Sequence, residues 1–382
     1  PARRPPPGPS PPCDRPPPPS SAGRARPGQA GRMSSPEWGA LIATGSKDGT
    51  ARLWRATDGR CVMTLRGHLD SVNAVAFSPE QYYMATASSD STSKVWSTLT
   101  GKVLCTFAEH NREVLAVTFS PDGSKVMTGG SDARALIWAP ENGKWVKPGA
   151  LQPHHGAVTS VAFAPRGHQE ALMLTGSRDK NARTWNTWGA EAKVFSGHQD
   201  EVSGVAWAPD GSTVATASEQ GCAKLWQWAT GTCITTCEGH EDAVMTVAYS
   251  PDSRCLATGS ADGTAKVWNL HGECMLTLKG HEEEVTSVAF SPDGTCLATA
   301  SLDGTARVWD MGTARCVMIL RGHEEGLTSV AFQPRDHVVP VPIMPLGDAG
   351  EKESDMSLPE ALKPKNHHED YMKDPKKWLD DL

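Results

Sequence analysis

Seven histidines recur through the middle of the 382-residue chain at intervals of 41 to 44 residues. Most units also carry a Ser, an Asp two positions later and a Trp that closes a short apolar run. Ser, His and Asp are the residue types of a catalytic triad, so a hydrolase has to be considered. A triad is normally built once, however, and no G-x-S-x-G elbow is present. We therefore interpret the set as structural and predict no enzyme activity, no cofactor and no metal.

Each repeat unit predicts four short strands, typified by VTSVAF, LATAS, ARVW and CVMIL between residues 285 and 320. The connecting string SPDG suits a β-turn, and DGT suits a tight hairpin. The first strands are apolar on both faces, which is typical of strands enclosed between neighbouring sheets. Self-similarity at this period indicates a repeat fold.

The strings GH…VAF and SxDGTAxxW closely resemble the WD40 (transducin β-like) repeat, although the Trp-Asp pair itself survives only at Trp309-Asp310. The resemblance implies an all-β fold, a seven-bladed β-propeller, with disordered termini. The first unit lacks a first strand and the last supplies only that strand, so we predict that 327–332 completes blade 1. The predicted propeller spans 34–333, with blades at about 41–66 plus 327–332, 72–107, 114–151, 158–195, 202–237, 244–278 and 285–320.

In WD40 relatives these residues form a buried chain in which Trp donates to Ser, Ser to His and His to Asp. Blade 3 departs from the pattern with Gly130 in place of Ser, and blade 5 with Gln220 in place of Asp. We expect those two edges to be the softest. The sets that the resemblance implies are His323, Ser46, Asp48 and Trp54; His68, Ser88, Asp90 and Trp96; His154, Ser177, Asp179 and Trp185; His240, Ser260, Asp262 and Trp268; and His281, Ser301, Asp303 and Trp309.

Peptide partners of WD40 relatives often contact the top face, at fixed positions after the GH histidine and before the hairpin Asp. Acidic side chains outnumber cations there and no aromatic residue appears, so we expect a basic partner segment, steered by Glu201, Glu219 and Glu284. An ordinary solvated acidic rim is the alternative. The resemblance assigns this role to Lys47, Asn73, Glu113, Leu115, Arg178, Glu201, Glu219, Met245, Glu284 and Leu302.

A second candidate surface falls in turns expected on the opposite, bottom face. Trp188 and Trp228 stand there outside the periodic tryptophans, as either an anchor patch or residues packed against a blade edge. The polar tail, 334–382, ends in DPKKWLDDL, whose Trp378, Leu379 and Leu382 would share one helix face. Such a segment suits docking into a groove, with a disordered tail as the alternative.

Composition and charge exclude several classes of protein. The formal net charge of −7 argues against nucleic acid as a partner. The sequence has no apolar run of 18 residues, so it predicts no membrane-spanning helix. Five of the ten cysteines, at one phase of the repeat, are interpreted as small hydrophobes that fill the blades. These five are Cys61, Cys105, Cys233, Cys274 and Cys316. The ten cysteines, together with the lack of a signal peptide, favour a reducing cytoplasmic or nuclear setting.

The Pro- and Arg-rich segment 1–33 begins without Met. We interpret it as a disordered leader, either a gene-model artefact or the remnant of a longer chain. The remaining sequence favours a monomeric propeller within a larger complex, acting as a non-catalytic scaffold or adaptor for other proteins or peptides. One alternative is a ubiquitin-ligase substrate receptor, although Trp309-Asp310-Met311-Gly312 lacks the Arg of a W-D-x-R motif. Another is a subunit of an RNA-processing or ciliary assembly complex.

Overall fold

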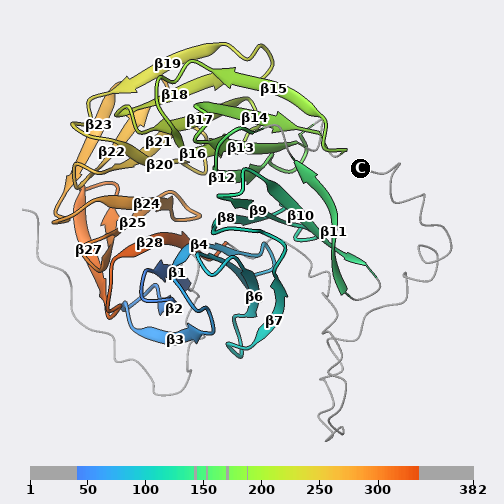
Figure 1. Cartoon of the computed structure of the whole chain (residues 1–382). Helices are drawn as coiled ribbons and strands as arrows, with labels where there is room; N and C mark the ends of the chain where they lie inside the picture. Colours follow the sequence, from blue (N-terminus) through green and yellow to red (C-terminus); the bar gives the residue numbers. More distant parts are fainter. Residues whose placement is uncertain (1–40, 142–143, 152–153, 169–171, 187, 335–382) are drawn as a thin grey trace, which may run out of the picture. The chain divides into compact units, whose positions relative to one another are not determined.

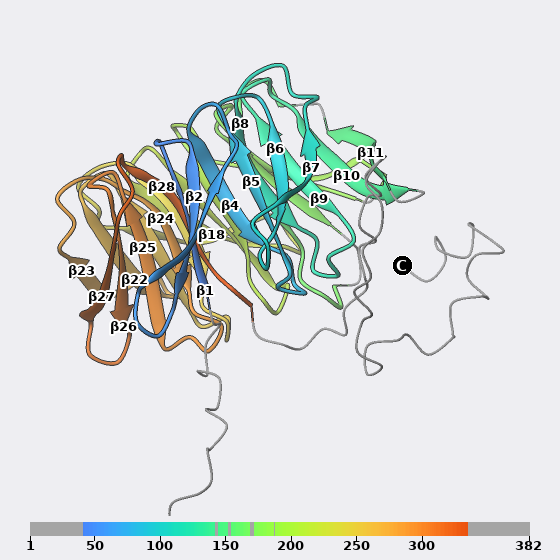
Figure 2. The same cartoon turned by 90° about the horizontal axis from the view of Figure 1, so that it is seen from below.

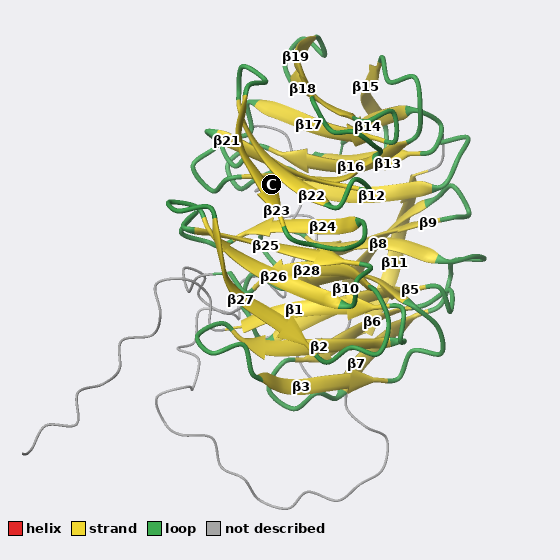
Figure 3. Cartoon of the chain, turned by 90° about the vertical axis from the view of Figure 1, so that its left-hand side faces the viewer, coloured by secondary structure: helices red, strands yellow, loops and turns green. Residues whose placement is uncertain are grey.

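The computed structural model describes residues 41–141, 144–151, 154–168, 172–186 and 188–334, which form seven four-stranded antiparallel sheets. Figure 1 shows the sheets arranged around a common centre, each with the first strand of its repeat innermost. Every regular element in this part of the chain is a strand (Figure 3). The segments 1–33 and 335–382, including Trp378, Leu379 and Leu382, lie outside the described residues.

The sheets, or blades, are numbered in chain order and their strands are given from the innermost outward. Blade 1 contains β28 (Leu327–Phe332), β1 (Leu41–Ser46), β2 (Thr50–Arg55) and β3 (Cys61–Arg66). Blade 2 contains β4 (Val72–Phe77), β5 (Tyr83–Ser88), β6 (Ser93–Ser97) and β7 (Val103–Phe107), and blade 3 contains β8 (Val114–Phe119), β9 (Val126–Gly130), β10 (Ala135–Glu141) and β11 (Lys144–Leu151). Blade 4 contains β12 (Val158–Phe163), β13 (Met173–Ser177), β14 (Asn181–Trp185) and β15 (Glu191–Ser196), and blade 5 contains β16 (Val202–Trp207), β17 (Thr213–Ser218), β18 (Cys222–Gln227) and β19 (Cys233–Glu238). Blade 6 contains β20 (Val244–Tyr249), β21 (Cys255–Ser260), β22 (Thr264–Asn269) and β23 (Cys274–Lys279), and blade 7 contains β24 (Val285–Phe290), β25 (Cys296–Ser301), β26 (Thr305–Asp310) and β27 (Arg315–Arg321).

The predicted closure of blade 1 is confirmed. Strand β28 pairs antiparallel with β1, from Ile42 opposite Phe332 to Ser46 opposite Leu327. It also lies between the innermost strands β24 and β4 of the neighbouring blades, as Figures 1 and 2 show. The two ends of the described chain therefore meet in one sheet, and no first-strand edge of that sheet is left unpaired.

The core lies between the sheets. Seven clusters of buried apolar residues each join two adjacent blades, and the cluster between blades 7 and 1 contains Ile42, Val308 and Phe332. Second strands are buried on both faces and are built from small residues, which lets the blades approach closely. At Gly129, for example, an added Cβ would lie 2.7 Å from a methyl of Val158 in the next blade.

The turn between second and third strands needs one residue in the left-handed backbone region. Glycine supplies it in four blades, as at Gly263 with φ of 76°. Blades 2, 3 and 4 instead hold Ser91, Ala133 and Lys180 there, with φ between 62° and 72°. A side chain in this conformation costs on the order of 1 kcal/mol. These turns, together with the loops that carry the seven histidines, form what we call the top face; the turns after first and third strands form the bottom face.

Candidate functional site

The recurring histidines sit in one hydrogen-bond chain, which blade 2 shows clearly. Trp96 Nε1 donates to Thr86 Oγ1 at 2.8 Å, and Thr86 Oγ1 lies 2.7 Å from His68 Nε2. His68 Nδ1 lies 2.8 Å from Asp90 Oδ2. Since the indole can only donate, Thr donates onward to Nε2, and the imidazole proton sits on Nδ1 facing the carboxylate. The chain runs Trp, Thr, His, Asp.

The predicted role of the serines in this chain is wrong. Ser88 Oγ instead donates to Asp70 O at 3.1 Å and accepts from Asp90 N at 3.1 Å, so it ties the histidine loop to the hairpin turn. Thr86, two residues earlier in β5, holds the place between Trp and His. The threonines of the seven chains are Thr44, Thr86, Thr128, Thr175, Thr216, Thr258 and Thr299. Ser46, Ser177, Ser260 and Ser301 bond as Ser88 does.

Blade 1 draws its histidine from the other end of the described chain. His323 Nε2 lies 2.8 Å from Thr44 Oγ1, and His323 Nδ1 lies 2.8 Å from Asp48 Oδ2. Trp54 Nε1 completes the set by donating to Thr44 Oγ1 at 2.8 Å. This pairing across 275 residues confirms that the ring closes as predicted. The remaining sets meet in the same way around Asp132, Asp179, Asp262 and Asp303.

The network fixes the charge of its members. Burial alone would raise the pKa of Asp90, but hydrogen bonds from Thr92 and His68 outweigh it and hold that pKa at about 2. Burial lowers the pKa of His68, and the Asp90 carboxylate only partly offsets that fall. Both directions favour a neutral imidazole beside a carboxylate, which suits a fixed structural network.

Blades 3 and 5, which depart from the repeat pattern, differ in how their histidines are held. In blade 3, Asp132 still holds His110 at 3.0 Å, and Arg134 adds a contact to the same carboxylate at 2.6 Å. In blade 5, Gln220 turns to Gln199 N and Cys222, and the buried His198 Nδ1 has no partner among the described residues. Burial and nearby Lys224 lower the pKa of His198 to about 4.

One predicted top-face residue, Asn73, proves to connect neighbouring blades. Asn73 Nδ2 donates to Val114 O in the first strand of blade 3, at 2.9 Å. In four other blades the residue at the same position also donates to a backbone carbonyl in the first strand of the next blade. We call these bonds the inter-blade staples. Leu115 in blade 3 and Met245 in blade 6 occupy this position and have no donor. The other staples are Thr159 to Val202 O, Ser203 to Val244 O, Thr286 to Leu327 O and Thr328 to Val72 O.

The predicted acidic rim contains an internal ion pair. Arg178 Nε lies 3.2 Å from Glu201 Oε2, and Glu219 N donates to Glu201 O at 3.1 Å. Burial raises the pKa of Glu219, and the charge of Glu201 raises it further against the opposing effect of Arg178. Glu284 and Leu302 lie in blade 7 and are joined there by a backbone bond of 3.0 Å.

A hollow of about 710 Å³ opens beside this ion pair on the top face. Arg112, Glu113, Arg178 and Glu201 give it two cations and two anions. The lining is therefore polar and charged, and it runs over the loops of blades 2 to 5. Lys47 is exposed on the same face, where its backbone N donates to Gly326 O at 2.9 Å.

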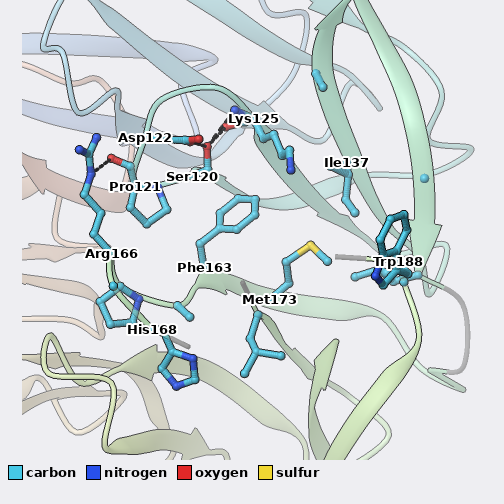
Figure 4. Close-up of a pocket in the computed structure, with 18 of the residues that line it drawn as sticks. Ser120, Pro121, Asp122, Lys125, Ile137, Phe163, Arg166, His168, Met173 and Trp188 are labelled. Carbon is cyan, nitrogen blue, oxygen red and sulfur yellow. Dashed lines mark hydrogen bonds between the residues drawn. The ribbon is translucent and has the colours of Figure 1, made fainter. Parts of the chain in front are cut away.

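The bottom face carries a cavity of about 700 Å³ between blades 3 and 4, drawn in Figure 4. Ile137, Phe163 and Met173 lie on its apolar side, and Trp188, with 75% of its surface exposed, stands at one edge. Trp228 is half-buried against Trp207 and against His168, which itself lines the cavity, with ring centroids 5.5–5.6 Å apart. The two predicted tryptophans thus differ in exposure, and a shared bottom-face patch stays a prediction.

With this geometry in view, comparison with known proteins decides the family. The family model described as "WD domain, G-beta repeat" matches seven segments, residues 33–55, 59–97, 101–139, 146–186, 189–227, 231–269 and 272–310. The chain belongs to the WD40 repeat family. Its Trp-Thr-His-Asp chains and its shared first blade are therefore features of a WD40 propeller.

Relatives of this WD40 chain match only parts of it. The nuclear distribution protein PAC1 of Coccidioides posadasii is 30% identical over 198 residues, covering 52% of this chain and 36% of the relative. The small ribosomal subunit protein RACK1 of Candida albicans is 38% identical over 90 residues, covering 22% and 28%. The ribosome biogenesis protein WDR12 homolog of Trichoplax adhaerens is 39% identical over 77 residues, covering 18% of each. This chain thus spans well under half the length of these relatives.

The structure also corrects the interpretation of the cysteines. Cys61, Cys233 and Cys274 are exposed and Cys105 and Cys316 are half-buried, because fourth strands are the outermost of each blade and have one open edge. Among the described residues no group of three His, Cys, Asp or Glu side chains could hold a metal ion. No helix in the same part of the WD40 chain is long and apolar enough to cross a membrane.

The sequence did contain a signal for the missed threonines. A Thr two residues before the expected Ser position occurs in all seven units, whereas the Ser is absent from blade 3. Residues two apart in a strand share a face, so either hydroxyl was sterically plausible. Strict recurrence was the better guide, because the network needs its hydroxyl in every WD40 blade.

Proposed function

We propose that this WD40 protein is a non-catalytic adaptor whose top face binds a partner segment rich in Lys or Arg. The observation that carries the proposal is the crowding of Glu201 and Glu219 beside a single cation, Arg178. Two carboxylates sharing one partner gain stability when a second positive charge arrives. A basic side chain from a partner would supply that charge at the edge of the polar hollow.

The hydroxyl chemistry supports the non-catalytic part of the proposal. A nucleophilic Ser needs its oxygen beside a base, and Ser88 Oγ instead bonds a backbone carbonyl while His68 bonds Thr86. Identical networks in several blades fit a scaffold whose rigidity presents loops to partners.

The test is affinity capture from cell extract followed by quantitative mass spectrometry. The full chain is compared with Glu201→Lys/Glu219→Lys/Glu284→Lys, and bound proteins are eluted with increasing salt. We expect the triple variant to lose most basic partners, and the remaining capture to depend less on salt.

A matched control reverses three exposed carboxylates at the bottom-face turns, Asp58→Lys, Asp210→Lys and Glu273→Lys. This variant has the same net charge as the test variant and should keep the partners. If both variants retain or lose the same proteins, the top-face assignment is wrong.

A second candidate role, as a subunit of an RNA-containing assembly, is favoured by the ribosomal names of two of the relatives above. Co-sedimentation of the full chain with ribosomal particles, before and after RNase treatment, tests it. Absence from every particle fraction would exclude this role.

A further inference from the structure

The bottom-face cavity between blades 3 and 4 has a volume of about 700 Å³ and one largely apolar wall. It lies where the turn after β8, the turn after β12 and the turn after β14 converge. Its apolar wall contains Ile137, Leu151, Phe163, Leu172, Met173 and Trp188. A hollow of about 700 Å³ accommodates one or two large side chains of a peptide.

The mouth of the cavity carries two cations and one carboxylate, since Lys125, Arg166 and Asp122 all line it. The charge of Lys125 helps to lower the pKa of Asp122, so the lining keeps one positive charge in excess. Arg166 Nε donates to Pro121 O at 2.8 Å, which fixes the guanidinium at the rim. The nearby Asp122 accepts from Ser120, at 2.5 Å, and from Ser124 in its own turn. Figure 4 shows Lys125 extending between Phe163 and Ile137.

We propose that the cavity binds the C-terminal segment 374–382 of the same molecule, DPKKWLDDL. Trp378 and Leu379 would fill the apolar hollow, and Asp380 and Asp381 would face Lys125 and Arg166. Lys376 and Lys377 precede the apolar pair and would face Asp122, so the segment offers both signs of charge that the mouth of the cavity requires.

The chain leaves the propeller on the face that holds the cavity. At the end of β28, Gln333 N donates to Leu41 O at 2.9 Å, and Gln333 Nε2 reaches Gln81 O at 3.4 Å in the bottom turn of blade 2. The cavity lies two blade junctions further around the same face. No passage through the ring is therefore required for the segment to reach it.

The intervening length of chain is sufficient. Trp378 follows Pro334 by about 44 residues. A chain of that length spans up to roughly 145 Å when fully extended. Packed sheets lie about 10 Å apart, so the cavity is roughly 20–30 Å away. Docking within one molecule then proceeds at a high effective concentration of the segment.

The experiment uses a fluorescein-labelled peptide of residues 372–382 as the probe and fluorescence anisotropy as the readout. The receptor is the full chain carrying Trp378→Ala/Leu379→Ala/Leu382→Ala, so that its own segment does not compete. We expect micromolar binding to this receptor and at least fivefold weaker binding to the unaltered chain, whose own segment occupies the cavity.

Two pocket variants of the receptor, Trp188→Ala and Lys125→Glu, should each weaken peptide binding at least fivefold. The matched control is Leu99→Ala/Lys102→Glu at the corresponding turn of blade 2, where Leu99 is 72% exposed. It should bind the peptide unchanged. Equal thermal stability of all variants excludes misfolding as the cause.

Three results would overturn the proposal: no binding of the peptide at 200 µM, equal binding to the receptor and the unaltered chain, or equal loss in the pocket and control variants. A concentration-dependent dimer of the unaltered chain that disappears in the tail variant would also overturn it, by assigning the contact to a second copy. Because none of these variants touches the top face, the result is independent of the proposed adaptor function.

Discussion

Blade 4 is held differently on its two sides. Toward blade 5, Thr159 donates to Val202 O at 2.5 Å, and Ser160 accepts from Val205 N at 3.1 Å. Toward blade 3, the corresponding positions are Leu115 and Ala116, which have no hydrogen-bonding side chain. The first strands of blades 4 and 5 are joined by polar bonds as well as apolar packing. The first strands of blades 3 and 4 are joined by packing, and a polar bond at that junction, from Arg166 to Pro121 O, lies in the bottom-face turns.

Two bottom-face cavities lie at the junctions whose first strands lack a staple. The cavity of about 700 Å³ lies between blades 3 and 4, and another of about 520 Å³ lies between blades 6 and 7. These are the two junctions at which Leu115 and Met245 replace the staple. Both junctions without a staple therefore also hold a bottom-face cavity, although Leu115 and Met245 themselves do not line it.

Strand β28, which is stapled on both sides and closes the ring, provides the largest expected effect. It bonds blade 2 through Thr328 and blade 7 through Thr286, and it buries Leu327, Val330 and Phe332. Burial of these three side chains stabilises the fold by roughly 5–9 kcal/mol, which approaches the whole stability of a domain. A stop codon after Gly326 should abolish cooperative thermal unfolding measured by circular dichroism.

The control for this truncation is a stop codon after Pro334, which removes the tail and keeps β28. That variant should unfold cooperatively at nearly the temperature of the full chain. If the shorter product is equally stable, closure of the ring by β28 contributes little.

The top edge of blade 5 offers a second test, because this well-stapled neighbour of blade 4 lacks one carboxylate. The pKa of His198 falls from about 6.5 in the unfolded chain to about 4 in the fold, so the unfolded state binds the extra proton between those pH values. Stability should therefore fall as the pH drops through this window. Gln220→Asp gives His198 Nδ1 an acceptor and raises the pKa of His198. It should increase the free energy of unfolding at pH 6 by about 1–3 kcal/mol.

Denaturant unfolding at pH 7, 6 and 5 measures this effect. Gln220→Glu serves as a control, since it has the charge but a longer side chain. A stability loss of equal steepness in Gln220→Asp and the unaltered chain would show that His198 does not limit acid stability.

Removing the staple on the stronger side of blade 4 should have a moderate effect. Thr159→Val keeps the side-chain shape but leaves Val202 O without its donor, which costs about 1–2 kcal/mol. The melting temperature should fall by roughly 2–6 °C. No change in melting temperature would mean that water replaces the lost donor.

Adding a staple on the weaker side should have the smallest effect. Leu115→Thr places a hydroxyl where it can reach Val158 O, as Thr159 reaches Val202 O in the next blade. The new bond contributes about 0.5–1 kcal/mol, and the loss of half-buried leucine surface offsets most of it. Destabilisation by more than 2 kcal/mol would show that the packing of Leu115 stabilises this junction more than a staple does.

Much of the architecture was predictable, because each repeat carries its own turn signals and buried strands. The SPDG and DGT strings placed the turns, and the incomplete first and last units required β28 to join β1. The position of His323 beside Asp48 followed from the same count. The choice between Ser88 and Thr86 did not, since both lie on one face of β5 and only the indole position of Trp96 selects between them.

The roles of the top-face positions could not be predicted from the sequence of one repeat alone. Asn73 and Thr159 face the next blade, so their partners are carbonyls that lie one full repeat further along the chain. A partner-binding role and a stapling role suit the same polar residue types, and sequence patterns do not separate them. The exposed Cys61 illustrates the same problem, because its surroundings depend on the open edge of the outermost strand.

The order of residues alone determined that seven similar units form seven blades and that the ring closes through its C-terminal strand, because hydrophobic period and turn chemistry are local. Only the tertiary structure decided which hydroxyl completes each network, which polar residues join adjacent blades and where a cavity remains between them. Those outcomes depend on distances between separate sheets, which are set when the blades pack around the ring.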